Sequence, residues 1–203
     1  VKMPDNGDTT PNEPANLLVR VAVTQDANYE VSESFTLTAT NTGGAGASGT
    51  GTIVDDGTGD VFGLLNTTGV PDTPGNPLDP SLAAVLDDDR PVTVNSVTVN
   101  EGSPYIIFTV GAVEGQYVKL GTGSGTATVG TDTSSALEYW NGSAWVAYTP
   151  GTFVKMPDNG DTTPNEAANL LVRVAVTQDA NYEISESFTL TATNTGGTGA
   201  SGT

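Results

Sequence analysis

The chain has 203 residues, with 24 Asp and Glu against 6 Lys and Arg, a formal net charge of −18, no His and no Cys. Without imidazoles or thiols, it has no means of Ser-His-Asp or Cys-His catalysis, zinc binding through nitrogen or sulfur, or thiol redox chemistry. The negative charge would repel phosphate backbones and anionic lipid headgroups, so we expect no nucleic-acid partner and no membrane contact by this segment.

The N-terminal segment is repeated later in the chain. Residues 1–50 recur as residues 154–203, an offset of 153 residues, and the copies differ only at Pro14/Ala167, Val31/Ile184 and Ala45/Thr198. This period exceeds the roughly 20 to 50 residues of a solenoid unit, so each period is expected to be a whole domain with its linker. The neighbouring repeats of the same polypeptide are then its expected partners. Residues 1–56 are predicted to be the C-terminal half of one β-sandwich repeat.

Residues 57–92 are predicted to be a semi-extended linker. The segment is rich in Gly and Asp and contains prolines, which cannot join the interior of a sheet, at positions 71, 74, 77, 80 and 91. It also holds Asp60 and the run Asp87 to Asp89, which either binds calcium at the domain junction or forms a solvated acidic turn.

Residues 93–203 are predicted to be the next β-sandwich repeat, lacking its last strand. Short runs bounded by Gly, Pro, Asn or Asp predict strands, and Asn141-Gly142 predicts a two-residue hairpin turn. No segment keeps a helical period. The pattern favours an all-β, immunoglobulin-like antiparallel sandwich of about seven strands. The expected strands are 96–100, 105–111, 116–120, 125–129, 136–140, 144–148, 170–177 and 187–194, with an equivalent last strand at 49–56 in the first copy.

The two copies compete for one position in that sandwich. Either residues 1–56 dock on residues 93–153 as a circular permutant, or residues 154–203 dock there and borrow a final strand from elsewhere, which another chain could supply. We therefore expect half-domain complementation within or between chains, and the sequence leaves both arrangements open.

Acidic residues cluster at the predicted strand ends. Two carboxylates about 4 Å apart repel by roughly 4 kcal/mol at an effective dielectric constant near 20, so such a cluster opposes folding unless a cation neutralises it. Calcium suits a chain that offers only oxygen ligands, whereas the alternative is an acidic, solvated surface. The candidate metal ligands are Asp26, Glu30, Glu33, Asp55, Asp56, Asp60, Asp87, Asp88, Asp89, Glu101, Asp132, Asp179, Glu183 and Glu186.

The stretch from Asp179 to Phe188, followed in the first copy by the Ile53 to Gly57 segment, resembles the Calx-beta motif. That family binds calcium at one end of a seven-stranded sandwich, and Glu101 and Asp132 match two more of its acids. The second copy lacks the terminal Asp pair, so the resemblance implies a complete site only if Asp55 and Asp56 are donated.

The wider pattern resembles the tandem repeats of giant RTX-type bacterial adhesins. It is carried by residues 97–105, 139–145 and 192–197. The resemblance implies a secreted, cell-surface spacer stiffened by structural calcium and exported by a type I route, which projects a distal binding domain for surface attachment or biofilm formation.

A ligand-binding module is the alternative function. Tyr139, Trp140, Trp145 and Tyr148 could form a carbohydrate platform, although such clusters are more often core packing. The alternating threonines at 36–42 and 189–195 could bind ice but are typical of the solvent face of a sheet. Arg20 and Arg173 are expected to pair with acids across a sheet. We expect no enzymatic activity, because the acids lie in turns without an apolar pocket.

Overall fold

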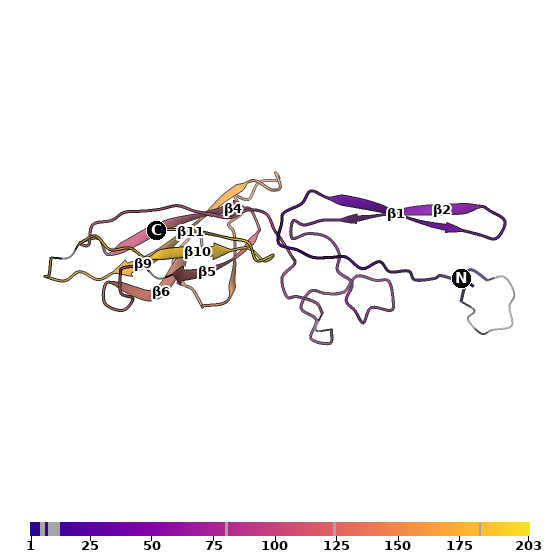
Figure 1. Ribbon diagram of the computed structural model, residues 1–203, viewed down its shortest axis with the longest axis horizontal. Helices are drawn as coiled ribbons and strands as arrows, with labels where there is room; N and C mark the ends of the chain where they lie inside the picture. Colours follow the sequence, from indigo (N-terminus) through magenta and orange to yellow (C-terminus); the bar gives the residue numbers. More distant parts are fainter. Residues whose placement is uncertain (5–6, 8–12, 80, 124, 183) are drawn as a thin grey trace. The chain divides into compact units, whose positions relative to one another are not determined.

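The computed structural model describes residues 1–4, 7, 13–79, 81–123, 125–182 and 184–203. The chain is all-β, with 37% of residues in strands and several antiparallel sheets, and the described residues form no helix (Figure 1). A search of the same residues accordingly found no helix with the length and hydropathy needed to cross a membrane. The predicted fold class is confirmed at this level.

The chain divides into two compact units. The first comprises residues 1–25 and 59–84, and the second comprises residues 26–58 and 85–203. Each unit therefore combines a part of the first copy with a part of the segment that follows it.

One sheet of the second unit has five antiparallel strands. Its order is β3 (Thr93–Val94), β4 (Tyr105–Val113), β9 (Ala167–Val176), β6 (Thr133–Trp140) and β7 (Trp145–Ala147). A second sheet of four strands has the order β11 (Gly199–Gly202), β10 (Thr189–Thr193), β5 (Tyr117–Gly123) and β8 (Phe153–Lys155). We call residues 92–203, which hold these two sheets, the two-sheet body.

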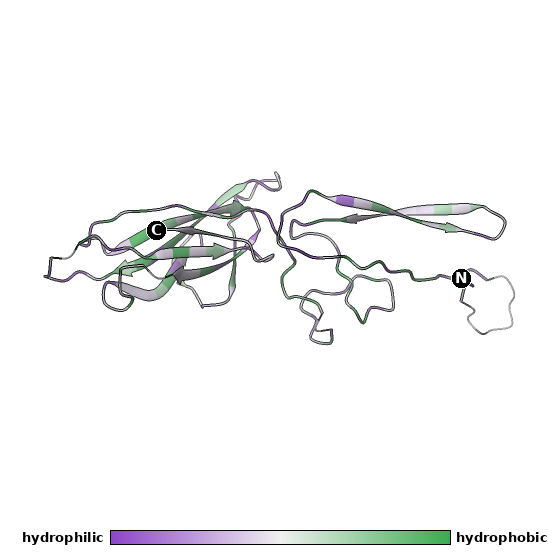
Figure 2. Cartoon of the chain, in the orientation of Figure 1, coloured by the Kyte–Doolittle hydropathy of each residue, from purple (hydrophilic) through white to green (hydrophobic). Residues whose placement is uncertain are grey.

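The two sheets share one hydrophobic core. Alternate residues of β4 and β10 are buried, as the period of a strand with one covered face requires. Phe108 of β4 meets Phe188, which precedes β10, edge to face with ring centroids 5.6 Å apart. Figure 2 shows hydrophobic stretches along the strands of the two-sheet body. This arrangement is compatible with a β-sandwich.

The second copy occupies the position for which the two copies compete. β9 pairs with β4 along residues 105–113 and with β6, while β10 pairs with β5 from Lys119 to Gly123. The equivalent of β10 in the first copy is β1 (Glu33–Thr40), which pairs with β2 (Gly46–Ile53) in a separate two-stranded sheet. Residues 154–203 therefore complete the body, and residues 1–56 do not.

Two segments predicted to be strands, both within the described residues, are not strands in the structure. Residues 96–100 form no strand, because the side-chain Oδ1 of Asn95 accepts the Thr109 N–H at 2.7 Å in place of a backbone carbonyl. Residues 125–129 form no strand either. The Gly125 backbone lies so close to the Ser187 carbonyl that a Cβ would overlap it, and the segment then turns at Thr128 to Asp132.

The predicted hairpin at Asn141-Gly142 is confirmed, but its loop is longer than two residues. Trp140 pairs with Trp145, so the connection spans residues 141–144. The Asn141 side chain accepts the N–H groups of Ser143 and Ala144, and Gly142 has a φ of 96°. The Asn141 side chain and the positive φ of Gly142 thus form the turn, as predicted. The length of the loop follows from the β6–β7 register, in which Trp140 pairs with Trp145.

Residues 59–79 and 81–84 of the first unit form a series of turns and not the extended connector that we expected. Val61 and Asp72 form an isolated bridge, and Asp72 Oδ2 accepts the Gly63 N–H at 2.8 Å. Asp79 is buried and accepts the N–H groups of Leu65 and Ser81. The Ser81 hydroxyl, followed by these backbone donors, lowers the pKa of Asp79. Carboxylates that accept backbone N–H groups thus hold this proline-rich segment in a compact form.

Candidate metal centre

A short antiparallel pairing in the second unit brings together acids that lie far apart in the sequence. The segment after β2 runs beside residues 87–89, where Asp56 and Asp88 form a bridge. The Gly57 N–H donates to the Asp87 carbonyl at 2.9 Å, and the Asp89 N–H donates to the Asp55 carbonyl at 3.4 Å. The end of the first copy is thereby held against the segment that enters the two-sheet body.

The alternation of an extended chain separates the three consecutive aspartates. Asp87 and Asp89 join Asp55, and one carboxylate oxygen from each residue lies within 4.8 Å of the other two. The Asp88 side chain instead meets the Arg90 guanidinium. We call Asp55, Asp87 and Asp89 the acidic triad.

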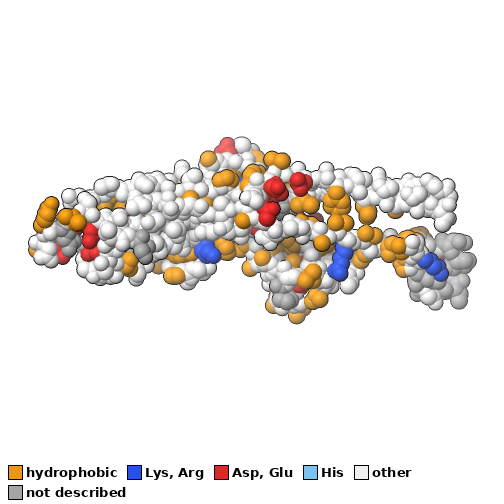
Figure 3. Space-filling view, viewed as in Figure 1, with side chains coloured by type: hydrophobic (Ala, Val, Ile, Leu, Met, Phe, Trp, Pro, Cys, Tyr) orange, Lys and Arg blue, Asp and Glu red, His pale blue; other side chains and the backbone are white. Residues whose placement is uncertain are grey.

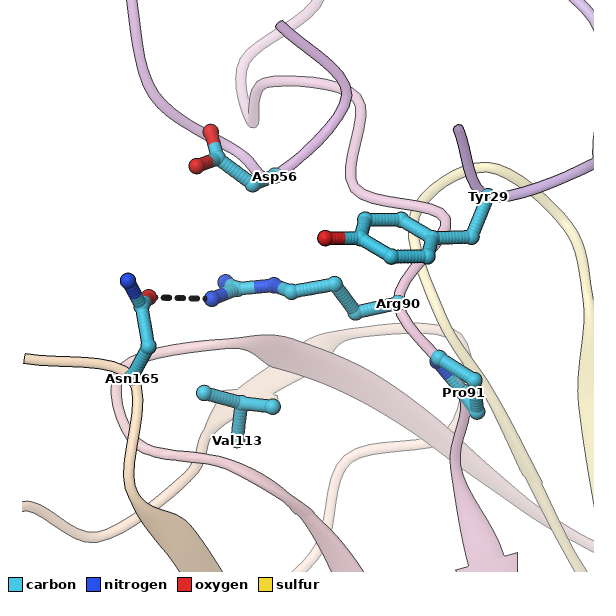
Figure 4. Close-up of a pocket in the computed structure, with 6 residues that line it drawn as sticks. All are labelled: Tyr29, Asp56, Arg90, Pro91, Val113 and Asn165. Carbon is cyan, nitrogen blue, oxygen red and sulfur yellow. Dashed lines mark hydrogen bonds between the residues drawn. The ribbon is translucent and has the colours of Figure 1, made fainter. Parts of the chain in front are cut away.

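Asp88 and Arg90 form a buried ion pair beside the acidic triad. Arg90 Nε donates to Asp88 Oδ1 at 2.9 Å, and Nη2 donates to Oδ2 at 2.6 Å. Arg90 Nη1 also donates to Asn165 Oδ1 at 2.7 Å, in a depression that Tyr29 and Asp56 help to line (Figure 4). The hydrogen bond to Asp88 raises the Arg90 pKa against the opposing effect of burial. Arg90 thus neutralises Asp88, one acid of the run. Its positive charge is therefore not available to neutralise the acidic triad.

The two-sheet body fixes the backbone of the Asp87 to Arg90 segment. Gln116 Nε2 donates to the Arg90 carbonyl at 2.7 Å, and Asn194 Nδ2 donates to the same oxygen at 3.1 Å. The Thr195 hydroxyl donates to the Leu86 carbonyl at 2.8 Å. Both amide side chains are buried, so the segment is anchored from the residue before β5 and from the β10–β11 turn.

Asp89 is the most constrained member of the acidic triad. Asp89 is 3% exposed, and its carboxylate Oδ1 is buried with no hydrogen-bond partner among the described residues. Burial, and then the charges of Asp87, Asp55, Asp26 and Asp88, raise its pKa to about 6. A buried carboxylate that lacks donors is costly unless a cation or a proton compensates it.

The acidic triad fits a hard divalent cation. All its donors are carboxylate oxygens, the ligands that calcium prefers, and their three negative charges exceed the charge of the ion. Asp55 Oδ2 also accepts the Glu30 N–H at 3.0 Å, which orients that carboxylate. Because calcium takes six to eight oxygen ligands, three carboxylates would be only part of its coordination shell.

Other predicted ligands near the triad have different roles in the structure. Asp26 is near enough for its charge to raise the Asp89 pKa. Glu30 meets Asp55 through its backbone N–H. Asp56 Oδ1 accepts the N–H and the hydroxyl of Thr58. These residues surround the triad without belonging to the group whose oxygens lie within 4.8 Å.

The remaining predicted ligands lie elsewhere. Glu33 is exposed at the start of β1, and Asp60 is exposed in the first unit. Glu101 Oε1 accepts the Asp179 N–H at 2.9 Å, Asp132 Oδ2 accepts the Thr128 N–H at 2.6 Å, and Glu186 is exposed. Glu183 lies outside the described residues. On the face that Figure 3 draws, acidic side chains form small separate groups. The described acids at the Glu101 end form no group of three comparable with the triad.

An aromatic cluster on β4, β6, β7 and β9 is organised around a cation. Arg173 lies over the rings of Tyr105 and Trp145, at 3.9 Å and 4.3 Å from their centroids, and pairs with Glu138 at 2.6 Å. Trp140 and Trp145 meet edge to face at 5.6 Å. The predicted pairing of Arg173 with an acid across the sheet is confirmed. Because Arg173 covers one face of Trp145, that face is not open to a sugar ring.

Sequence reasoning missed the residues that position the triad. Gln116 and Asn194 hold the Arg90 carbonyl, and the Arg90 side chain pairs with Asp88. Gly196 packs against Asp89 so closely that a Cβ would overlap its carboxylate. The Asn-Thr-Gly-Gly run from residue 194 indicated only a turn. Its contact with residues 86–90 spans more than one hundred positions of sequence and leaves no local pattern.

Comparison of the chain with models of known protein families, with curated protein sequences and with solved structures found no match.

Proposed function

We propose that this chain is a structural spacer of a large extracellular bacterial adhesin, built of tandem immunoglobulin-like repeats of Calx-beta type with about seven strands. In this proposal, calcium is a structural ligand, export is of type I, and the segment has no catalytic role. The stalk projects a distal binding domain for surface attachment or biofilm formation. The resemblance of the sequence to RTX-type adhesin repeats supports this function.

One observation carries the mechanical part of the proposal. Asp55 lies at the end of residues 1–56, the predicted C-terminal half of one repeat, whereas Asp87 and Asp89 immediately precede the two-sheet body of the next repeat. A divalent cation held by all three carboxylates would tie the end of one period to the start of the next. It would also remove the repulsion among them, so the junction would be stiff with calcium and loose without it.

Thermal unfolding of the 203-residue chain tests the calcium site. Calcium at about 100 times its dissociation constant would stabilise the folded chain by about 2.7 kcal/mol relative to chelator. Asp89→Asn should abolish most of this gain, whereas Glu33→Gln, an equal change of charge at an exposed acid, should preserve it. Equal melting temperatures of the parent chain in millimolar calcium and in chelator would refute the site.

Small-angle scattering tests the stiffening role separately. A polypeptide of several 153-residue periods should give a rod-like profile in calcium and a flexible-chain profile in chelator. If calcium raises the melting temperature but leaves this profile unchanged, the site exists and the stalk mechanism is wrong.

A carbohydrate-binding function is not favoured by the aromatic cluster. Tyr148 is buried and donates its hydroxyl to the Thr152 carbonyl, and Trp145 stacks against Arg173. These contacts are those of a structural cluster, so the spacer remains the better supported function.

A further inference from the structure

The two-stranded sheet β1–β2 has the backbone geometry of β10–β11 but lacks its neighbours. Leu37 to Thr40 pair with β2 in the register that Leu190 to Thr193 use toward β11, offset by 153 residues, for example Leu37 with Gly49 and Leu190 with Gly202. β10 also pairs with β5, whereas within the described residues β1 pairs with β2 alone. One edge of β1 is therefore an open pairing edge.

The side chains on β1 show the same difference. Phe35 is 39% exposed and Leu37 is 45% exposed, whereas their equivalents Phe188 and Leu190 are 7% and 0% exposed. Phe188 packs on Phe108 of the other sheet. The Phe35 ring lies instead over the backbone of its cross-strand partner Gly51, where a Cβ would come within 2.7 Å of it. The hairpin thus presents apolar residues that its duplicate buries.

From this difference we propose that the open edge and apolar face of β1 bind, in trans, residues 92–153 of a second chain whose own residues 154–203 are not docked on them. This segment carries β5, whose Lys119 to Gly123 would pair with Thr36 to Thr40 in the register it uses with Thr189 to Thr193. It also carries β4, whose Phe108 would cover Phe35. This occupant is chosen because the two copies are nearly identical in sequence. Across the hairpin segment 33–50, they differ only at Ala45/Thr198, in the turn.

The occupant must be free of its own residues 154–203. In the folded chain, β10 already pairs with β5, and β9 lies between β4 and β6. Pairing within one chain benefits from a high effective concentration. A second chain whose residues 154–203 are docked therefore offers no open strand edge. The hairpin is consequently a docking site for an uncompleted repeat and joins separate chains by strand addition.

A second exposed segment of the first copy is consistent with the same occupant. In the first unit, Leu17, Val19 and Val21 are 43%, 56% and 58% exposed, whereas their equivalents Leu170, Val172 and Val174 are at most 2% exposed on β9. In the two-sheet body, β4 and β6 provide that cover. Residues 92–153 carry both of these strands, which the exposed segment lacks within its own unit.

Fluorescence anisotropy with a labelled peptide of residues 92–153, titrated with the full 203-residue chain, tests this binding. We expect a saturable one-to-one complex, in chelator as well as in calcium, and amide shifts of Thr36 to Thr40 in the isotopically labelled full chain. Leu37→Asp should weaken binding by at least about tenfold, since it would bury a charge against the occupant. Leu78→Asp, the same change at another exposed leucine, should leave binding unchanged.

Two results would overturn the proposal. One is no binding of the peptide to the full chain. The other is equal binding to the parent and Leu37→Asp chains, which would mean that the peptide enters the two-sheet body or adheres nonspecifically. Circular dichroism and melting of the Leu37→Asp chain confirm that any loss is local, since Leu37 lies outside the buried core. Neither result bears on the calcium site, because binding of the peptide is expected in chelator as well as in calcium.

Discussion

The two copies of the fifty-residue segment differ at three positions and yet occupy different environments. In the second copy, β9 and β10 contribute Leu170, Val172, Val174 and Leu190 to the core, each at most 2% exposed. In the first copy, the equivalent residues are exposed. Pairing of the hairpin strands needs only local sequence, because both copies form the same register. Burial needs β4, β5 and β6, so the difference between the copies isolates the contribution of tertiary partners.

Substitution of two equivalent leucines, one in each copy, should produce the largest difference in unfolding free energy. Leu190→Ala removes a fully buried side chain and should destabilise the two-sheet body by about 2 to 5 kcal/mol, as is usual for such a core cavity. Leu37→Ala, the same change 153 residues earlier, should stay within about 0.5 kcal/mol. Denaturant unfolding followed by the fluorescence of Trp140 and Trp145 measures both. Equal losses would mean that both copies contribute to the core in solution.

A methyl group added in the turn of each copy should give a smaller contrast. Gly196→Ala places a Cβ where the Asp89 carboxylate lies, and such overpacking should cost about 1 to 3 kcal/mol and weaken calcium binding. Gly43→Ala brings its Cβ only to 3.4 Å from Asn41 Oδ1 and should be nearly neutral. Unfolding and calorimetric calcium titration of both variants check this. An unaltered calcium affinity in Gly196→Ala would contradict the assignment of Asp89 as a ligand.

Two equivalent asparagines, Asn41 and Asn194, extend the comparison to single hydrogen bonds. Asn194 donates to the Arg90 carbonyl and accepts the Thr198 N–H at 2.8 Å, and it is buried. Asn194→Ala should therefore cost about 1 kcal/mol for each bond lost. Asn41 accepts the N–H groups of Gly43 and Ala45 but is exposed, so water replaces it. Asn41→Ala should change the unfolding midpoint of the body least, and a larger effect than that of Asn194→Ala would refute this reasoning.

The pH dependence of stability should report on Asp89, whose carboxylate lies against Gly196 of the second copy. Its folded-state pKa of about 6 lies above the ordinary 3.8, so the folded chain binds more protons than the unfolded chain between these values. In chelator, stability from this group is therefore greatest below pH 3.8 and is lost as the pH rises through 6. Asp89→Asn should be the more stable chain above pH 6, and the advantage should disappear near pH 4. Melting curves in chelator across this range measure it, and a parallel pH profile of the two chains would contradict the raised pKa.

The expectations from local patterns were met where one strand or one turn decides the outcome. The apolar run at Tyr105, the alternation before Thr177 and the Asn141-Gly142 turn predicted β4, β9 and the β6–β7 hairpin within a few residues. They failed at residues 96–100, beside which the Asn95 side chain accepts the Thr109 N–H, and at residues 125–129, where the Gly125 backbone lies close to the Ser187 carbonyl. Such distant contacts have no period by which a sequence could show them.

The acidic triad illustrates a mixed outcome. All three of its residues were among fourteen candidate ligands, because carboxylates at strand ends are visible in the sequence. What separated Asp87 and Asp89 from Asp88 was the alternation of the backbone and the position of Arg90, which claims the middle carboxylate. Asp89 became the buried member because Gly196 packs against it.

The sequence by itself determined that the chain is all-β, acidic and internally repeated, because composition and short-range periodicity depend only on neighbouring residues. Only the tertiary structure decided which copy completes the two-sheet body and which acids meet. The copies are almost identical, so no property of either one could select it. The selection rests on which copy lies against β4, β5 and β6, and on a backbone pairing that brings Asp55 to Asp89 across more than thirty residues.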